Sequence, residues 1–392
     1  MSTPIIAMSG RRRPGSEWVD SSATAGLDQA PDPQNRHHRK ERLMVRHTSA
    51  PAADGAGAGA DAVGSGRPAR QRRHRAVQVV ASDGVRLAVH DYGPACAEHT
   101  VVFLHGFCLA GVAWARQIAK LRRRYGNRIR IVSFDHRGHG QSDPAPMHTY
   151  HVEQLAEDLA EVLAALDVTG TVTFIGHSMG GMVALAYLAR PAAQRPVDPE
   201  GLVLVATAAG NLTQRGLGRL LATPATPALF ALLTHTPEHL LKAMAGPVCA
   251  ALGRWYGCGR AERATVSTLA VTALTRTPVS TAVGFLPSLR DHNQMAVLPT
   301  IRARTVIVSG GNDLLTPPDR AEELAAAIPG ATHVHVRDAG HMLPQQVPHV
   351  IDEAVRQVMA MPHQPDAVAG AGAVDAITAG GGYALAAAGV SI

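Results

Sequence analysis

The chain has 392 residues, of which 46% are hydrophobic and 4% aromatic, which is enough apolar material for one large core with flanking segments. The closest candidate for a membrane span, residues 217–233, is interrupted by Pro224 and Pro227, which excludes a continuous transmembrane helix there. The formal net charge is +6 at pH 7, and all of it comes from residues 1–75, which hold 13 Lys and Arg against 7 Asp and Glu.

Residues 1–75 form a tail rich in Arg, Ala, Gly and Pro, without apolar periodicity. Such a segment buries too little apolar surface to offset its ordering entropy, so we predict that it is disordered. Its positive charge is nearly all arginine, which favours a compositional bias over a nucleic-acid-binding arm. Residues 362–392 are dominated by Gly and Ala and are predicted to be a second disordered tail. The sequence allows a start at Met1 or at Met44.

The four cysteines lack the spacing of metal ligands, and a domain of this size needs no disulfide, which favours a reducing compartment. The short apolar run 5–8 is followed by three arginines, which is not the pattern of a signal peptide. We therefore expect a cytoplasmic protein, with a peripheral membrane contact left open.

The segment between the tails alternates strand and helix patterns. It opens with two alternating runs, 76–82 and 85–91, joined by Asp83-Gly84, a dipeptide that favours a hairpin turn. Buried strands are then predicted at 101–104, 129–134, 171–175, 202–206, 305–308 and 332–336. Helices are predicted at 114–124, 152–166 and 179–190. Strands separated by helical crossovers predict an α/β fold, with a mostly parallel sheet and helices on both faces.

A G-x-S-x-G sequence, Gly-His-Ser-Met-Gly at residues 176–180, lies between a predicted strand and a predicted helix. A serine in such a strained turn needs glycine two positions before and after it, because a Cβ atom there would clash. The helix N-terminus also stabilises negative charge that develops beside the serine. We therefore predict that Ser178 is a nucleophile at the carboxyl end of the sheet, where open α/β sheets bind their ligands.

These motifs, in this order, resemble the α/β-hydrolase superfamily over about residues 76–360. The strand at 101–104 runs into His105-Gly106-Phe107, which is similar to the family's oxyanion-loop motif. The resemblance implies that the backbone N–H groups of Phe107 and Met179 bind the oxyanion.

Residues 135–142, Asp-His-Arg-Gly-His-Gly-Gln-Ser, resemble the D-x-R-G-x-G-x-S turn that is common in the same family. We expect this turn to be structural. Asp135 and Arg137 should lie in a hydrogen-bonded network and take no part in the chemistry.

A serine nucleophile needs a general base, and the base needs an orienting partner. The chain has 20 histidines, so residue type alone does not select one. His341 follows the last predicted strand, where the family's catalytic histidine lies, and Asp313 follows strand 305–308, where the family's acid lies. The resemblance thus implies a triad of Ser178, Asp313 and His341 in the chain order that this fold uses. The alternative acid position of some relatives, after strand 202–206, holds no carboxylate here.

Residues 211–298 interrupt the predicted core, which comprises 76–210 and 299–361, at the place where relatives carry a helical cap. Such a cap excludes water and shapes an apolar pocket over the site. Its Leu, Met and Val residues, including Met244 and Val248, indicate an uncharged and fairly hydrophobic substrate.

His105, Cys108 and His177 flank the predicted site and complete the candidates for the substrate pocket. We expect the two histidines to make supporting hydrogen bonds rather than to transfer protons. Cys108 is expected to fill space in the pocket or the core.

The sequence therefore predicts a carboxylic ester hydrolase, esterase-like or lipase-like, which acts on a small molecule without metal or cofactor. Ser178 excludes the alkyl-ester route of relatives that have an aspartate nucleophile, such as epoxide hydrolases and haloalkane dehalogenases. A thioesterase, a carbon-carbon bond hydrolase and a cofactor-free haloperoxidase-type enzyme share these residues and remain alternatives. So does a ligand-binding protein that keeps the scaffold without turnover.

Overall fold

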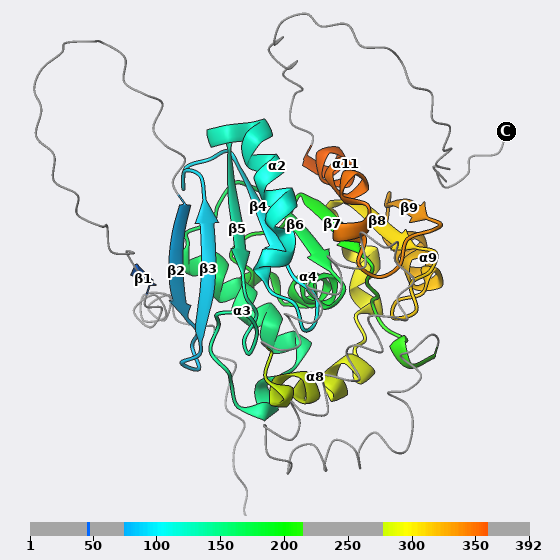
Figure 1. The fold of residues 1–392 in the computed structure, drawn as a ribbon, viewed down its shortest axis with the longest axis horizontal. Helices are drawn as coiled ribbons and strands as arrows, with labels where there is room; N and C mark the ends of the chain where they lie inside the picture. Colours follow the sequence, from blue (N-terminus) through cyan, green and yellow to red (C-terminus); the bar gives the residue numbers. More distant parts are fainter. Residues whose placement is uncertain (1–44, 48–73, 215–276, 360–392) are drawn as a thin grey trace, which may run out of the picture.

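A computed structural model describes residues 45–47, 74–214 and 277–359 (Figure 1). Within these residues a single sheet holds nine strands in the order β1-β2-β3-β5-β4-β6-β7-β8-β9. The strands are β1 (Val45–His47), β2 (His74–Val80), β3 (Arg86–Tyr92), β4 (His99–Leu104), β5 (Ile129–Phe134), β6 (Thr171–His177), β7 (Gly201–Val205), β8 (Arg304–Gly310) and β9 (Thr332–Val336).

The sheet is antiparallel at one edge and parallel elsewhere. Strands β1, β2, β3 and β5 pair in antiparallel fashion, and the β2–β3 pair is the predicted hairpin. From β5 through β4, β6, β7 and β8 to β9 every pairing is parallel. The carboxyl ends of these parallel strands consequently meet along one edge of the sheet.

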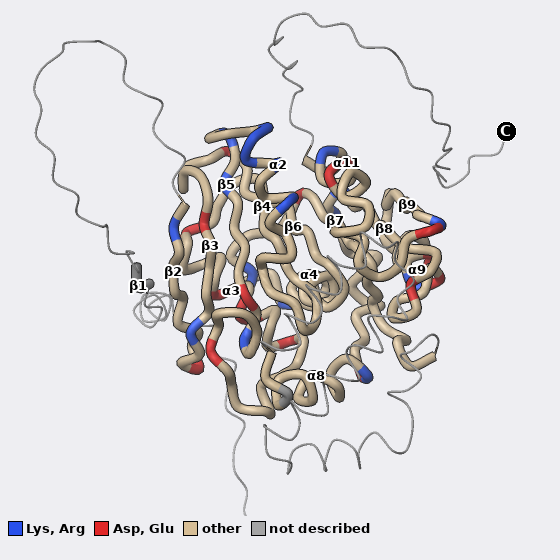
Figure 2. Tube along the Cα trace, in the orientation of Figure 1, with Lys and Arg blue, Asp and Glu red and all other residues tan. Residues whose placement is uncertain are grey.

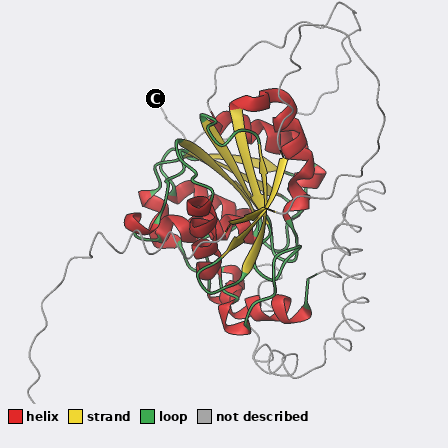
Figure 3. Ribbon diagram, turned by 90° about the vertical axis from the view of Figure 1, so that its left-hand side faces the viewer, coloured by secondary structure: helices red, strands yellow, loops and turns green. Residues whose placement is uncertain are grey.

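Helices cover both faces of the sheet (Figure 3). The described α-helices are α2 (Ala115–Tyr125), α3 (Val152–Ala165), α4 (Met179–Ala189), α8 (Val279–Asp291), α9 (Pro318–Ala327), α10 (Leu343–Gln346) and α11 (Pro348–Met359). The described 3₁₀ helices are η1 (Gly111–Trp114), η2 (Gly126–Arg128), η3 (Met147–Thr149), η4 (Ala192–Gln194), η5 (Leu212–Gln214) and η7 (Met295–Thr300).

Alternate residues of each central strand enter two separate hydrophobic cores. In β4, Val102 and Leu104 join the core under α3, α4 and α9, whereas Val101 and Phe103 join the core under α2 and α11. Because both faces are buried, the strand is a continuous apolar run, as parallel strands usually are. Strands β4, β6 and β7 and helix α4 carry no charged residue (Figure 2). The predicted α/β architecture is confirmed.

The N-terminal boundary of the sheet differs from the prediction. Residues 45–47, which we expected to lie in a disordered tail, form β1 against β2, and β2 begins at His74. The rest of the predicted tails lies outside the described residues, as does most of the predicted cap.

The described end of the predicted cap packs into the core. Phe285 of α8 is fully buried, with its ring centroid 5.1 Å from that of Tyr150 and 6.3 Å from that of Phe107. Leu298 of η7 is also fully buried. The core therefore includes residues before 299, the position at which we had predicted its second part to begin. Among the described residues, no helix combines the length and the apolar character that a membrane span needs.

Candidate active site

Ser178 lies in a sharp turn between β6 and α4, at φ +52° and ψ −120°. A residue other than glycine is strained in this region, so the surrounding structure must hold it there. A Cβ atom added at Gly176 would lie 2.6 Å from the carbonyl oxygen of Gly180, and one added at Gly180 would lie 2.2 Å from the carbonyl oxygen of Leu104. The two glycines of the G-x-S-x-G sequence thus let strand, turn and helix pack closely.

The backbone of Ser178 is fixed by the neighbouring strand and its loop. Its N–H donates a hydrogen bond to the oxygen of Val205 over 2.9 Å, and its carbonyl oxygen accepts one from Oγ1 of Thr207 over 2.7 Å. The side chain of Ser178 is half-buried, while those around it are buried. Its hydroxyl is therefore presented at the carboxyl edge of the sheet on a rigid backbone.

Asp313 and His341 come together from the loops that follow β8 and β9. Nδ1 of His341 lies 2.8 Å from Oδ2 of Asp313, and both side chains are buried. A carboxylate only accepts, so Nδ1 carries a proton, and in the neutral ring Nε2 is the atom with the lone pair. The structure thus gives His341 the tautomer that a general base needs.

Thr316 supports this pair and was not found from the sequence. Its hydroxyl donates to Oδ2 of Asp313 over 2.8 Å, and its backbone N–H donates to Oδ1 over 3.0 Å. Burial raises the pKa of the Asp313 carboxyl, but the charge of His341 and the hydrogen bonds from His341 and Thr316 lower it more. The net shift is downward, so Asp313 is ionised at neutral pH. The available signal for this contact in the sequence was the position of Thr316, three residues after Asp313.

His177, the residue before Ser178, contacts the loop of His341. Its Nε2 atom lies 2.9 Å from the backbone oxygen of His341, and the two rings are 5.0 Å apart between centroids. This contact brings the Asp313–His341 pair to the segment that carries Ser178.

The loop of residues 105–111, which we call the HG loop, packs against the same place. A Cβ atom added at Gly106 would lie 2.9 Å from Nδ1 of His177, so the loop approaches β6 closely. Within the described residues, the backbone N–H groups of Phe107 and Met179 have no hydrogen-bond acceptor. These are the two donors that we predicted for an oxyanion.

The other described pocket candidates are buried, and the two histidines among them make hydrogen bonds. His105 is fully buried, and its ring nitrogens contact the oxygen of Gly106 and the N–H of His136, so it does not line an open pocket. His177 is 2% exposed and bonded as described above. Cys108 is buried in the HG loop. Met244 and Val248 lie outside the described residues.

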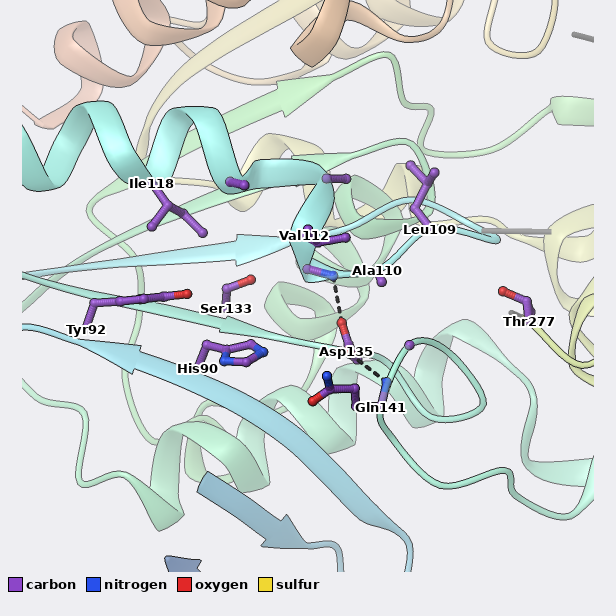
Figure 4. Close-up of a pocket in the computed structure, with 14 residues that line it drawn as sticks. His90, Tyr92, Leu109, Ala110, Val112, Ile118, Ser133, Asp135, Gln141 and Thr277 are labelled. Atoms are coloured by element: carbon purple, nitrogen blue, oxygen red, sulfur yellow. Dashed lines mark hydrogen bonds between the residues drawn. The ribbon is translucent and has the colours of Figure 1, made fainter. Parts of the chain in front are cut away.

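Residues 135–142, which we call the DxRG turn, form the predicted hydrogen-bonded network. Oδ1 and Oδ2 of Asp135 accept from the N–H groups of Gly111 and Gln141, over 2.6 and 2.8 Å (Figure 4). Arg137 makes two bonds of 2.7 and 2.6 Å to the carboxylate of Asp158, and both side chains are fully buried. The structural role that we expected for Asp135 and Arg137 agrees with these contacts.

Comparisons with known proteins agree with the fold. The family model for the alpha/beta hydrolase fold matches residues 99–344. The AB hydrolase superfamily protein YisY of Bacillus subtilis (strain 168) is 28% identical over 263 residues, covering 66% of this chain and 89% of that protein.

Two solved structures extend the likeness to three dimensions. A hydrolase from Pseudomonas aeruginosa PA01 has a TM-score of 0.59 at 26% identity, covering 75% of this chain and 100% of that one. An esterase from Exiguobacterium antarcticum has a TM-score of 0.57 at 25% identity, covering 72% and 99%. The chain belongs to the alpha/beta hydrolase fold family.

Proposed function

We propose that this protein hydrolyses a carboxylic ester of a small, fairly hydrophobic molecule through an acyl-enzyme on Ser178. The observation that carries the proposal is the buried 2.8 Å contact of Asp313 with Nδ1 of His341, on a loop that contacts the residue before Ser178. The likeness of the protein to an esterase of known structure supports the same reaction class.

In this mechanism Oγ of Ser178 attacks the ester carbonyl carbon while Nε2 of His341 takes the hydroxyl proton. Asp313 stays ionised and stabilises the imidazolium that forms. Collapse of the tetrahedral intermediate breaks the bond to the alcohol oxygen, which receives the proton from His341. A water then repeats the same steps on the acyl-enzyme and releases the acid.

The negative charge on the tetrahedral oxygen needs donors that are in place beforehand. The N–H groups of Phe107 and Met179 have no other acceptor among the described residues, and Met179 is the first residue of α4. The helix N-terminus adds its partial positive charge at the same point. Such preorganised donors are worth about 10²- to 10³-fold in rate for each one removed.

The test is labelling by a fluorophosphonate, which phosphonylates an activated serine. The wild-type protein should be labelled at Ser178, and Ser178→Ala should be unlabelled and lose at least about 10³-fold in turnover of p-nitrophenyl butyrate. Ser82→Ala, at an exposed serine, is the matched control and should behave as wild type. A labelled, active Ser178→Ala protein would exclude the mechanism.

Labelling together with additional substrates separates the alternatives. A ligand-binding protein without turnover would leave both the probe and the ester unchanged. A carbon-carbon bond hydrolase would be labelled but would cleave a 1,5-diketone faster than the ester. A haloperoxidase-type enzyme would need peroxide and halide for its product, which the ester assay omits.

A further inference from the structure

The HG loop and the DxRG turn hold each other through two histidines, one from each segment. The backbone N–H of His136 donates to Nε2 of His105 over 2.9 Å. The backbone N–H of Cys108 donates to Nε2 of His139 over 3.2 Å. Each histidine thus accepts a hydrogen bond from the main chain of the other segment.

The second ring nitrogen of each histidine fixes its tautomer. Nδ1 of His139 lies 3.0 Å from the oxygen of Arg137, and Nδ1 of His105 lies 2.8 Å from the oxygen of Gly106. Carbonyl oxygens only accept, so Nδ1 is protonated and Nε2 is the acceptor in both rings. Burial lowers the pKa of His139 to about 3 and that of His105 to about 4. Both rings therefore remain acceptors at neutral pH.

The outer side of the HG loop and the start of η1 border a cavity, although Leu109 itself is buried. Leu109, Ala110 and Val112 border a cavity of about 360 Å³ (Figure 4), and Val112 is 68% exposed. On this side the loop is tied by the bond from Gly111 to Asp135. Hydrogen bonds to the DxRG turn thus add to the ring contacts of His105 and Phe107 with His139 in placing the loop.

The bond to His139 acts next to the candidate oxyanion donor. Cys108 has φ +55°, a strained value for a residue with a side chain, and its N–H belongs to the peptide that follows Phe107. The peptide group that carries the Phe107 N–H contains the carbonyl of Gly106, and Gly106 packs on His177. Fixing both peptides sets the direction of the Phe107 N–H.

We propose that His139 is a positioning residue, which aligns the N–H of Phe107 with the developing oxyanion by holding the N–H of Cys108. This inference rests on the proposed function. Under this proposal the DxRG turn contributes to catalysis by positioning the N–H of Phe107, in addition to forming its structural network.

The test compares two amides of different reach at this position. In His139→Asn the amide reaches only the place of Nδ1, so it keeps the bond to Arg137 and loses the bond to Cys108. In His139→Gln the amide oxygen reaches the place of Nε2 and accepts from Cys108. We expect His139→Asn to lower kcat for p-nitrophenyl butyrate about 10- to 100-fold with KM within about threefold, and His139→Gln to retain most of kcat.

Inhibition by phenylboronic acid gives a readout that loss of stability alone would not move. This compound forms a tetrahedral adduct with a serine, so its Ki should rise in His139→Asn by about the factor that kcat/KM falls. Binding of butyrate, a ground-state ligand, should not change.

His99→Asn is the matched control. His99 is buried in β4, and its Nε2 atom bonds to Oγ1 of Thr173 over 2.9 Å, away from the HG loop. This variant should lose similar stability and keep kcat. Wild-type kcat in folded His139→Asn, or equal loss in His139→Gln and His139→Asn, would overturn the inference. Absence of fluorophosphonate labelling in the wild type would instead refute the proposed function.

Discussion

Nε2 of His177 lies 2.9 Å from the backbone oxygen of His341, so the residue before the candidate nucleophile holds the loop of the candidate base. Burial and the neighbouring His341 lower the pKa of His177 to about 3, and the ring stays neutral with its proton on Nε2. This hydrogen bond therefore helps to set the position of the base relative to Ser178, together with the bond to Asp313.

Replacing His177 by leucine should weaken both the fold and the reaction. The carbonyl of His341 loses its donor in a buried site, which should lower the free energy of unfolding by about 1–3 kcal/mol in urea denaturation. Turnover of p-nitrophenyl butyrate per folded molecule should fall about tenfold, since the base is less well placed. His99→Leu makes the same chemical change in β4 and should lower stability alone. Equal loss of turnover in both variants would contradict the role of His177.

Replacing Asp313 by asparagine should leave the fold intact and nearly abolish turnover. Oδ1 of Asp313 accepts from the backbone N–H groups of Leu315 and Thr316, and an amide oxygen can keep both bonds. The amide NH₂ then takes the place of Oδ2 and faces Nδ1–H of His341, which favours the wrong tautomer. We expect kcat to fall by up to about 10⁴-fold, with the melting temperature near that of wild type.

Thr316→Val provides the comparison for Asp313→Asn. It removes the 2.8 Å bond from the threonine hydroxyl to Oδ2 of Asp313, together with the 3.4 Å contact of that hydroxyl with Nδ1 of His341, and should lower kcat about tenfold or less. If Asp313→Asn kept wild-type kcat, the orienting carboxylate would have to be sought elsewhere.

The sequence alone was sufficient to predict features whose structural cause lies in neighbouring residues. The turn at Ser178 is enforced by glycines two residues away on either side, whose missing Cβ atoms leave room for the backbone of Gly180 and Leu104. The parallel strands were found because burial on both faces makes each one a short apolar run. The candidate positions Asp313 and His341 came from the resemblance to the α/β-hydrolase superfamily, which has its acid and its base in the loops after two such strands.

Contacts between distant segments could not be derived in this way. The bond between Cys108 and His139 joins residues 31 positions apart, and neither residue type nor spacing predicts it. Similarly, the sequence of α8 does not say that Phe285 enters the main core. Strand β1 has three residues, too few for an alternating pattern to stand out in a low-complexity tail.

The buried histidines around the site predict a pH dependence of stability, and His139 gives the clearest case. Its pKa is about 3 in the folded protein, because of burial and the nearby His105, whereas an unfolded histidine titrates near 6.5. Between these values the unfolded chain binds a proton that the folded protein does not. The free energy of unfolding therefore falls as the pH decreases, with a contribution of up to about 1.4 kcal/mol per pH unit from this residue.

His139→Gln removes that contribution while keeping an acceptor for Cys108. Urea unfolding measured from about pH 6 down to about pH 4.5 should therefore show a slope against pH that is shallower by about 1.4 kcal/mol per unit than in wild type. His99→Gln should flatten the slope similarly, because burial lowers the pKa of His99 to about 4, and should leave kcat unchanged. Parallel slopes for wild type and His139→Gln would mean that His139 takes up its proton equally in both states, and that it does not remain a neutral acceptor in the folded protein.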